Sequence, residues 1–305
     1  MRRAFATALA ELAANDDRIL LLTGDLGYMA LEPFADVFPE RFLNVGVAEH
    51  NMAGIATGLA EAGFLPYTYS IATFASLRPL EMIRNGPIAH GLPVRIVGVG
   101  GGFEYGQNGI SHYPIEDVGI MRIQPALTVI APADHRQART AILQTADLRG
   151  PIYYRLGKDD VTLVEGLDGR FELGRVEVIR SGSDVVLVAL GAAALEAAAA
   201  ADRLERDGIS PTVAVVASFN PAPVADLVDL FSRHVLAVTV EAHYINGALG
   251  SLAAETIAEE GLDCRLVRCG VVSMPDGRSG TQAYLHALHG IGAEQIQSRV
   301  VTALS

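Results

Sequence analysis

The stretch RFLNVGVAEHNMAGIATGLAEAGFLPYTYS, residues 41–70, decides the fold. It contains two runs of strand length, residues 41–47 and 65–70, on either side of a Gly- and Ala-rich segment, residues 49–62, with the apolar spacing of a helix. A strand, a helix and a strand in this order predict a βαβ unit with parallel strands. Helices cover both faces of such a sheet, so its strands are expected to be continuously apolar.

The same alternation continues along the first half of the chain. Further apolar runs, separated by segments of helix length, lie at residues 18–23, 94–99, 127–130 and 152–156. The charged, Gly-containing stretch GKDDVTLVEGLDGRFELG, residues 157–174, then breaks the rhythm. It predicts a domain boundary.

Beyond this boundary the alternation resumes. Four strand-length apolar runs, again separated by helix-length segments, lie at residues 185–190, 212–218, 235–241 and 264–269. We therefore predict an α/β protein made of two consecutive open parallel-sheet domains, residues 1–165 and 166–305.

Composition limits the partners of the protein. The 305 residues include 23 Lys and Arg against 35 Asp and Glu, which gives a net charge of −12. An acidic surface argues against nucleic acid and anionic membranes as partners. Half of the residues are apolar and only 19% are charged, against roughly 25% charged in an average soluble domain. We therefore expect an obligate oligomer.

Neither metal chemistry nor export is indicated. Cys264 and Cys269 belong to no CxxC or His/Cys ligand spacing, so we expect two buried thiols and no metal site on this chain. The opening MRRAFATALAEL lacks the apolar core of a secretory signal. The most apolar stretch, residues 185–201, contains Glu196 and is not expected to cross a membrane. We expect a protein of the reducing cytoplasm.

Polar residues follow three of the predicted strands, where the sites of open parallel sheets lie. Asp25 follows the first strand and Glu49 the second, and the loop GGGFEYGQNGISHYP, residues 100–114, follows the strand at 94–99. This loop does not form a GxGxxG dinucleotide fingerprint, and the chain has no Walker-type GK[ST].

These residues have structural as well as catalytic interpretations. Glu49 could complement the dipole of the helix that it begins, or serve as a proton-donating carboxyl group, since an apolar setting disfavours the ionised form. His112, in the third loop, could be a hydrogen-bonded loop residue. Arg155, at the end of a strand, could cap the next loop or bind an anionic substrate.

Four motifs resemble the carboxyl half of the transketolases in the family's order and spacing. They are RFLNVGVAEHNMAGIATGLAEAGFLPY, ATFASLRPLEMIRN, GQNGISHYPIEDVGIMRIQPALTVIAPAD and PIYYRLGK. The stretch VEAHYINGALGS, residues 240–251, resembles the family's VEExxxxGGLGS. The likeness covers essentially the whole chain and is closest to split transketolases, in which this half is a separate subunit. It implies a pyrimidine-binding domain followed by the transketolase C-terminal domain.

For the cofactor, the resemblance implies thiamine diphosphate with Mg²⁺. Glu49 matches the catalytic glutamate that hydrogen-bonds the pyrimidine ring nitrogen and so activates the thiazolium carbon of the cofactor. Leu26, which follows Asp25, matches the apolar residue that supports the bent cofactor. Phe74 matches the aromatic residue that packs on the pyrimidine, with a one-residue difference in the spacing to Arg78.

For the substrate, the resemblance implies that His112 contacts substrate oxygens during catalysis and that Arg155 binds a phosphate group. The chain departs from the family at this end of the site. Asn108 stands where the family has an acid, and the glycines at 100–102 stand where it has a phosphate-contacting histidine. We infer a substrate unlike the standard pentose phosphates, with fewer phosphate groups.

The half of the family that binds the diphosphate through Mg²⁺ has no counterpart in this sequence. The chain contains no GDG motif, and the DG pairs at 168–169 and 276–277 have no suitable downstream Asn. We therefore predict an N-terminal transketolase subunit as partner, an α2β2 assembly, and no activity of this subunit alone.

The expected reaction is transfer of a two-carbon ketol unit from a ketose donor to an aldehyde acceptor. One alternative is the β subunit of a 2-oxo acid dehydrogenase, which has ISE and HSQ patterns where this chain has GVAEHNM and GISHYPIED. A deoxyxylulose phosphate synthase is a further alternative, but it carries both halves on one chain. A non-catalytic scaffolding homologue is also possible in principle, and the presence of Glu49 and His112 argues against it.

Overall fold

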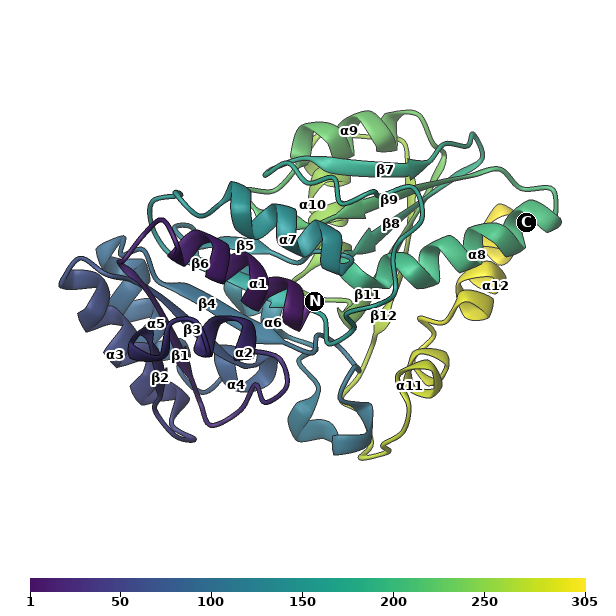
Figure 1. Cartoon of the computed structure of the whole chain (residues 1–305). Helices are drawn as coiled ribbons and strands as arrows, with labels where there is room; N and C mark the ends of the chain where they lie inside the picture. The colour runs from purple at the N-terminus through teal and green to yellow at the C-terminus, as the bar shows by residue number, and fades with distance from the viewer.

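A seven-stranded sheet forms the core of the first half of the chain in the computed structural model, which describes all 305 residues (Figure 1). Its strand order is β10-β5-β6-β4-β3-β1-β2. The strands are β1 (Ile19–Thr23), β2 (Phe42–Asn44), β3 (Leu65–Ile71), β4 (Arg95–Val99), β5 (Thr128–Ile130), β6 (Ile152–Leu156) and β10 (Ser218–Asn220). All neighbours pair in parallel except β10, which runs antiparallel to β5.

Helices cover both faces of this sheet. They are α1 (Arg2–Ala13), α2 (Glu32–Ala35), α3 (Glu49–Glu61), α4 (Ala72–Ser76), α5 (Leu80–Ile83), α6 (Asp117–Arg122) and α7 (His135–Gln144). Strand β1 shows why its sequence is continuously apolar. Leu21 packs in a cluster with Phe5 of α1, and Leu22 packs in a separate cluster with Met52 of α3. Successive residues of a strand point to opposite faces of the sheet, so the residues on both faces must be apolar.

A five-stranded sheet forms the second half, with the order β12-β11-β8-β9-β7. Its strands are β7 (Val176–Arg180), β8 (Val185–Leu190), β9 (Pro211–Val216), β11 (Leu236–Tyr244) and β12 (Arg265–Val271). Its helices are α8 (Ala194–Arg206), α9 (Val224–Ser232), α10 (Leu249–Glu259), α11 (Gln282–Leu288) and α12 (Ala293–Leu304). All pairs are parallel except β7 with β9.

The predicted α/β fold with two open sheets is confirmed, with corrections at the edges. Each sheet is mostly parallel and has one antiparallel edge strand, β10 or β7. The run at residues 212–218, predicted as one strand, ends as β9 at Val216, and the chain then enters the other sheet as β10. The second half of the chain therefore completes the sheet of the first half.

The helix-length segment between the strands predicted at 65–70 and 94–99 does not form one continuous helix. The structure has α4, then α5, then a π-helical turn at Arg84–Ile88. Pro79 immediately precedes α5 and Pro87 lies inside the π-helical turn, and proline cannot supply the N–H that a continuous α-helix needs. The segment therefore forms two short helices and a π-helical turn between the inner strands β3 and β4.

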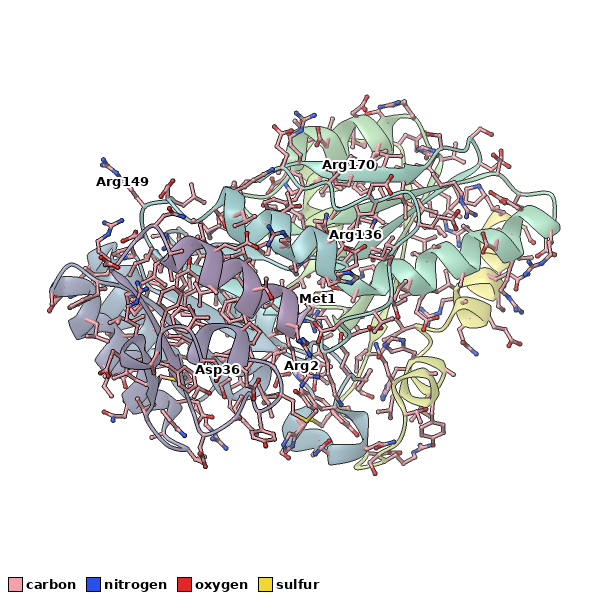
Figure 2. All side chains as sticks on the ribbon, viewed as in Figure 1. Met1, Arg2, Asp36, Arg136, Arg149 and Arg170 are labelled. Atoms are coloured by element: carbon pink, nitrogen blue, oxygen red, sulfur yellow. The ribbon has the colours of Figure 1, made fainter.

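The outside of the molecule is polar, with charged side chains such as Arg136 and Arg149 pointing outward (Figure 2). Both cysteines are buried and unpaired, as expected. None of the helices combines the length and the apolar character that crossing a membrane would require.

Candidate functional site

Loops at the carboxyl ends of β3, β4 and β6, together with the start of α3, bring six side chains into one row. We call this set the site row, and its members are Glu49, Arg78, Phe74, His112, Tyr105 and Lys158. The guanidinium carbon of Arg78 lies 3.9 Å from the centre of the Phe74 ring. The ring of His112 lies 5.1 Å from that of Phe74 and 6.4 Å from that of Tyr105, and the Lys158 ammonium lies 4.8 Å from the Tyr105 ring.

Glu49 is the buried end of the site row. It is the first residue of α3, where the helix dipole favours a negative charge, and it is only 2% exposed. Its Oε1 accepts a hydrogen bond of 2.9 Å from the hydroxyl of Ser70, near the end of β3. Its Oε2 accepts one of 2.7 Å from Nη1 of Arg78. The junction is apolar in sequence, but the fold brings two donors to the carboxylate.

Phe74 and His112 form the middle of the site row. Their rings meet edge to face at an interplanar angle of 70°. His112 lies in the short helical turn Ile110–His112, and its Nδ1 is 3.0 Å from the hydroxyl of Ser111. This contact leaves Nε2 of His112 available to a bound molecule. Asn108, in the preceding turn Gly106–Asn108, is exposed and can reach solvent or a ligand at the mouth of the same loop.

Asp25 and Leu26 form a tight turn after β1. Asp25 has a φ of 59°, a left-handed conformation that is unusual for a residue with a side chain. Asn44 of β2 holds it there: its Oδ1 accepts from the Asp25 amide at 3.1 Å and its Nδ2 donates to Asp25 Oδ1 at 2.9 Å. The hydroxyl of Thr23 donates to the carbonyl of Leu26 at 2.7 Å. The turn therefore fixes where Leu26 projects.

Arg155 lies buried between the two sheets. It is 6% exposed, and its Nε lies 3.1 Å from Oδ2 of Asp117. Its Nη2 donates to the carbonyls of Pro114, at 2.8 Å, and of Ala242 in β11, at 2.9 Å. The same Asp117 oxygen accepts from the Tyr153 hydroxyl at 2.7 Å. Arg155 thus ties the two sheets together, and it also lines a cavity between them, so its predicted contact with a phosphate group stays a prediction.

His243 and Glu241, on β11, belong to the same contact region between the halves, which we call the seam. Nε2 of His243 accepts from the amide of Gly119 at 3.2 Å, and its Nδ1 lies 2.7 Å from the Tyr244 carbonyl. Burial lowers the pKa of His243 to about 4, so the ring is neutral. Burial raises the pKa of Glu241 to about 8, and this carboxyl group accepts from the first amides of α10. Both residues are structural.

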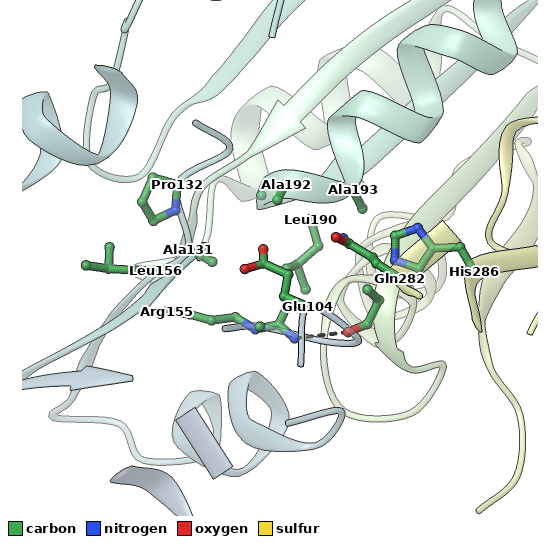
Figure 3. Close-up of a pocket in the computed structure, with 14 residues that line it drawn as sticks. Glu104, Ala131, Pro132, Arg155, Leu156, Leu190, Ala192, Ala193, Gln282 and His286 are labelled. Atoms are coloured by element: carbon green, nitrogen blue, oxygen red, sulfur yellow. Dashed lines mark hydrogen bonds between the residues drawn. The ribbon is translucent and has the colours of Figure 1, made fainter. Parts of the chain in front are cut away.

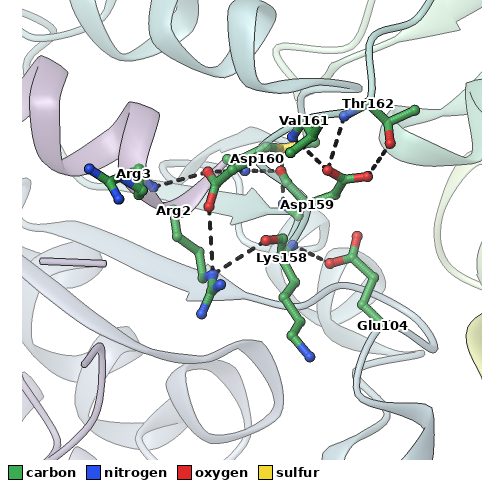
Figure 4. A network of polar contacts seen from close by, with 10 residues as sticks. Arg2, Arg3, Glu104, Lys158, Asp159, Asp160, Val161 and Thr162 are labelled. Atoms are coloured by element: carbon green, nitrogen blue, oxygen red, sulfur yellow. Dashed lines mark hydrogen bonds and ion pairs between the residues drawn. The ribbon is translucent and has the colours of Figure 1, made fainter. Parts of the chain in front are cut away.

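A cavity opens beside Arg155 between the two sheets, and Figure 3 shows Glu104, Gln282 and His286 pointing toward it. The carboxyl group of Glu104 accepts from the amide of Lys158 (Figure 4). Burial raises the pKa of Glu104 to about 7. Glu104 therefore shapes the loop that carries Lys158, and Arg2 holds that loop from the other side through the Lys158 carbonyl at 3.3 Å.

The structure thus connects Glu49, Phe74 and His112 through the contacts of the site row, and Arg155 is not among the residues that make these contacts. Ser70, Tyr105 and Lys158 were not predicted as site residues from the sequence. Ser70 and Lys158 follow the rule that polar residues at strand ends line such sites, so that rule was a usable signal. No pattern in the sequence identified Tyr105 as a site residue. No three His, Cys, Asp or Glu side chains lie close enough to hold a metal ion.

Comparisons with known proteins give a consistent assignment. The family described as transketolase, pyrimidine binding domain, matches residues 1–162, and the transketolase C-terminal domain family matches residues 174–296.

Two relatives match nearly full length. The chain is 36% identical to a putative transketolase C-terminal section from Methanocaldococcus jannaschii, over 99% of this chain and 95% of that protein. It is 35% identical to the 6-deoxy-6-sulfo-D-fructose transketolase subunit SqwH from a Clostridium species, over 97% of this chain and 92% of that protein.

A solved structure described as a split gene transketolase, inactive beta4 tetramer, matches with a TM-score of 0.90 and 38% identity. The match covers 99% of this chain and 97% of that one.

Proposed function

Because this chain belongs to the transketolase family, as the C-terminal section of its split members, we propose that it forms half of a thiamine diphosphate-dependent enzyme. The enzyme transfers a two-carbon ketol unit from a ketose donor to an aldehyde acceptor. The observation that carries the proposal is the buried Glu49 carboxylate. It lies close to the Phe74 ring, since the half-exposed Arg78 contacts both.

The chemistry of the site row fits the pyrimidine ring of the cofactor. Arg78 shows that the space beside Phe74 accepts a planar group that donates a hydrogen bond to Glu49. An aminopyrimidine is also planar, and its ring nitrogen can share a proton with Glu49. Glu49 and Phe74 would hold the ring, while the turn at Asp25 and Leu26 would support the cofactor from the next strand end. When bound, thiamine diphosphate supplies a carbon nucleophile that accepts the ketol unit.

The predicted site residues then have the following roles. Glu49 holds a proton between its carboxylate and the ring nitrogen, and its burial excludes water from that proton. His112 offers Nε2 to the oxygens of the substrate, since its Nδ1 already faces Ser111. Asn108, a neutral amide, hydrogen-bonds a hydroxyl group of the substrate. Arg155 closes the seam behind the loop.

The diphosphate and Mg²⁺ would be held by an N-terminal partner subunit, in an α2β2 complex. Exposed apolar side chains lie at the strand ends beside the site: Tyr28 is 86% exposed, Met29 74% and Val47 70%. Large apolar groups in this position favour burial against a partner. We place the enzyme in the cytoplasm, where its two free thiols stay reduced.

The test uses the chain assembled with its N-terminal partner, thiamine diphosphate and Mg²⁺. The ketoses tested as donors would include phosphorylated and unphosphorylated sugars and 6-deoxy-6-sulfo-D-fructose, the sugar in the name of one relative. We expect Glu49→Gln to lower ketol transfer by about 100-fold or more, because a general acid or base contributes about that much. Glu61→Gln, an exposed glutamate at the end of α3, is the matched control.

Two results would count against the proposal. Full activity of the Glu49→Gln complex would show that Glu49 has no catalytic role. Activity of the single chain without its partner would show that the active site is not divided between two subunits. A clear preference for xylulose 5-phosphate would contradict only the narrower inference that the substrate carries fewer phosphate groups.

A further inference from the structure

Arg78 occupies the place that the cofactor needs. Its guanidinium donates to Glu49 Oε2 at 2.7 Å and lies 3.9 Å from the centre of the Phe74 ring. These are the two groups assigned above to the pyrimidine, one to its ring nitrogen and one to its face. A planar cation therefore already makes both contacts in the chain as it stands.

Glu49 requires such a partner while no cofactor is bound. The Glu49 side chain is 1% exposed, and apart from Arg78 only the Ser70 hydroxyl donates to it. A buried carboxylate with too few donors is strongly destabilising. A guanidinium is suited to the position, because it is planar, always charged, and stacks on aromatic rings.

Arg78 can also leave at low cost. Its side chain is 45% exposed, and its contacts with Glu49 and Phe74 are the ones that hold it over the site. It lies in the short link between α4 and α5, next to Pro79, so no helix hydrogen-bond ladder fixes its position. On leaving, its charge moves into water, where a guanidinium is well solvated.

We propose that Arg78 is a stand-in for the aminopyrimidine of the cofactor. It satisfies Glu49 and covers Phe74 in the cofactor-free chain, and it swings out when the ring of thiamine diphosphate takes its place. This inference rests on the proposed cofactor role of Glu49. It adds that cofactor affinity is set by a competition between two ligands of the same carboxylate, one of which belongs to the protein.

The first measurement is cofactor affinity, by calorimetry, in the complex with the partner subunit and Mg²⁺. We expect Arg78→Met to bind thiamine diphosphate about tenfold more tightly, because the ring no longer displaces a charged hydrogen bond. Arg84→Met is the matched control, since Arg84 is exposed, lies six residues further on and donates a hydrogen bond to Asn85. It should leave the affinity unchanged.

The second measurement needs no cofactor. The thermal unfolding of the chain itself is compared for Arg78→Met, Glu49→Gln and the double variant. We expect Arg78→Met to lower the unfolding temperature and the double variant to recover most of the loss, because glutamine needs no cation. This arm reports on the pair even if the proposed enzyme function is wrong.

The outcomes separate the two proposals. Weaker or unchanged cofactor binding in Arg78→Met would overturn the inference, since Arg78 would then hold the cofactor or ignore it. Additive effects of the two substitutions on unfolding would overturn it as well. If the assembled wild type and its Glu49→Gln variant bind thiamine diphosphate equally, the proposed role of Glu49 fails, and the stand-in role of Arg78 fails with it.

Discussion

Two arginine–carboxylate pairs lie at the carboxyl edge of the same sheet and differ in one respect. In the site row, Arg78 meets Glu49 with 45% of the arginine side chain exposed. In the seam, Arg155 meets Asp117 with 6% exposed, and Tyr153 and two carbonyls share the contact. Both pairs bury a carboxylate. Only in the first pair can the arginine move into solvent.

The difference separates a replaceable contact from a permanent one. Breaking a fully buried pair leaves an uncompensated charge, whereas an arginine at the surface loses little when it moves into water. The same pairing can therefore lock two sheets together or keep a ligand site satisfied until the ligand arrives. Exposure of the arginine, and not the length of the contact, distinguishes the two roles.

The largest effect is expected from the seam. We expect Asp117→Ala to lower the free energy of unfolding by about 3–5 kcal/mol, because it leaves Arg155 buried without its counter-charge. Urea unfolding of the chain measures this. A loss below about 1 kcal/mol would show that the seam pair is as replaceable as the one at Glu49, and the contrast between the two regions would collapse.

A fall in pH should weaken the seam through His243. The folded pKa is about 4 and the ordinary value is 6.5, so between these values the unfolded chain binds the extra proton. The His243 contribution is thus complete above pH 6.5 and is lost as the pH falls toward 4, by about 3 kcal/mol in all. Protonation also removes the acceptor of the Gly119 amide.

The measurement compares wild type with His243→Gln from pH 7.5 to 4. Groups around His243 are charged or titrate as well: Asp117, Arg155 and Glu116 lie nearby, and Glu241 contributes stability in the opposite direction, lost as the pH rises toward 8. The difference between the two proteins removes these shared contributions. Parallel pH profiles would mean that His243 does not carry the effect.

The smallest effect is expected from the ion pair of Arg122 with Glu255, which also bridges the two halves and in which the carboxylate side chain is 48% exposed and the arginine side chain 16%. Arg122 and Asp117 belong to the same helix, α6, so the comparison is matched in position. We expect Glu255→Ala to change the free energy of unfolding by no more than about 1 kcal/mol, since exposed pairs contribute little. A loss comparable to that of Asp117→Ala would indicate that bridging, and not burial, stabilises the seam.

Much of the fold could be predicted because parallel strands are buried on both faces and leave a continuous apolar record in the sequence. The edges could not. Strand β10 pairs with β5 across about 90 residues of chain, and nothing in the run at 212–218 shows that it changes sheets at Ala217. Strand β7, just past the stretch predicted as a boundary, was not predicted. One face of this edge strand meets solvent, so its sequence is not continuously apolar.

The candidate site divides in the same way. Glu49 and His112 could be found, since a strand end or loop position and a motif coincide at each. The direction in which the Arg155 side chain points could not be predicted, because it is set by Asp117 and by the carbonyl of Ala242, 87 residues away. Ser70 and Arg78 reach Glu49 from 21 and 29 residues downstream. Such partners become visible only once the chain has folded.

The short strand β10 also limits how this protein can be divided. A chain cut in the stretch at 157–174 would leave the first sheet without its last strand, so the unpaired backbone of β5 would face water. An open strand edge is a template for pairing with other chains. The two halves look like separable modules in the sequence, but they share a sheet. Recombination that exchanged one half for that of a distant relative would have to preserve this shared edge.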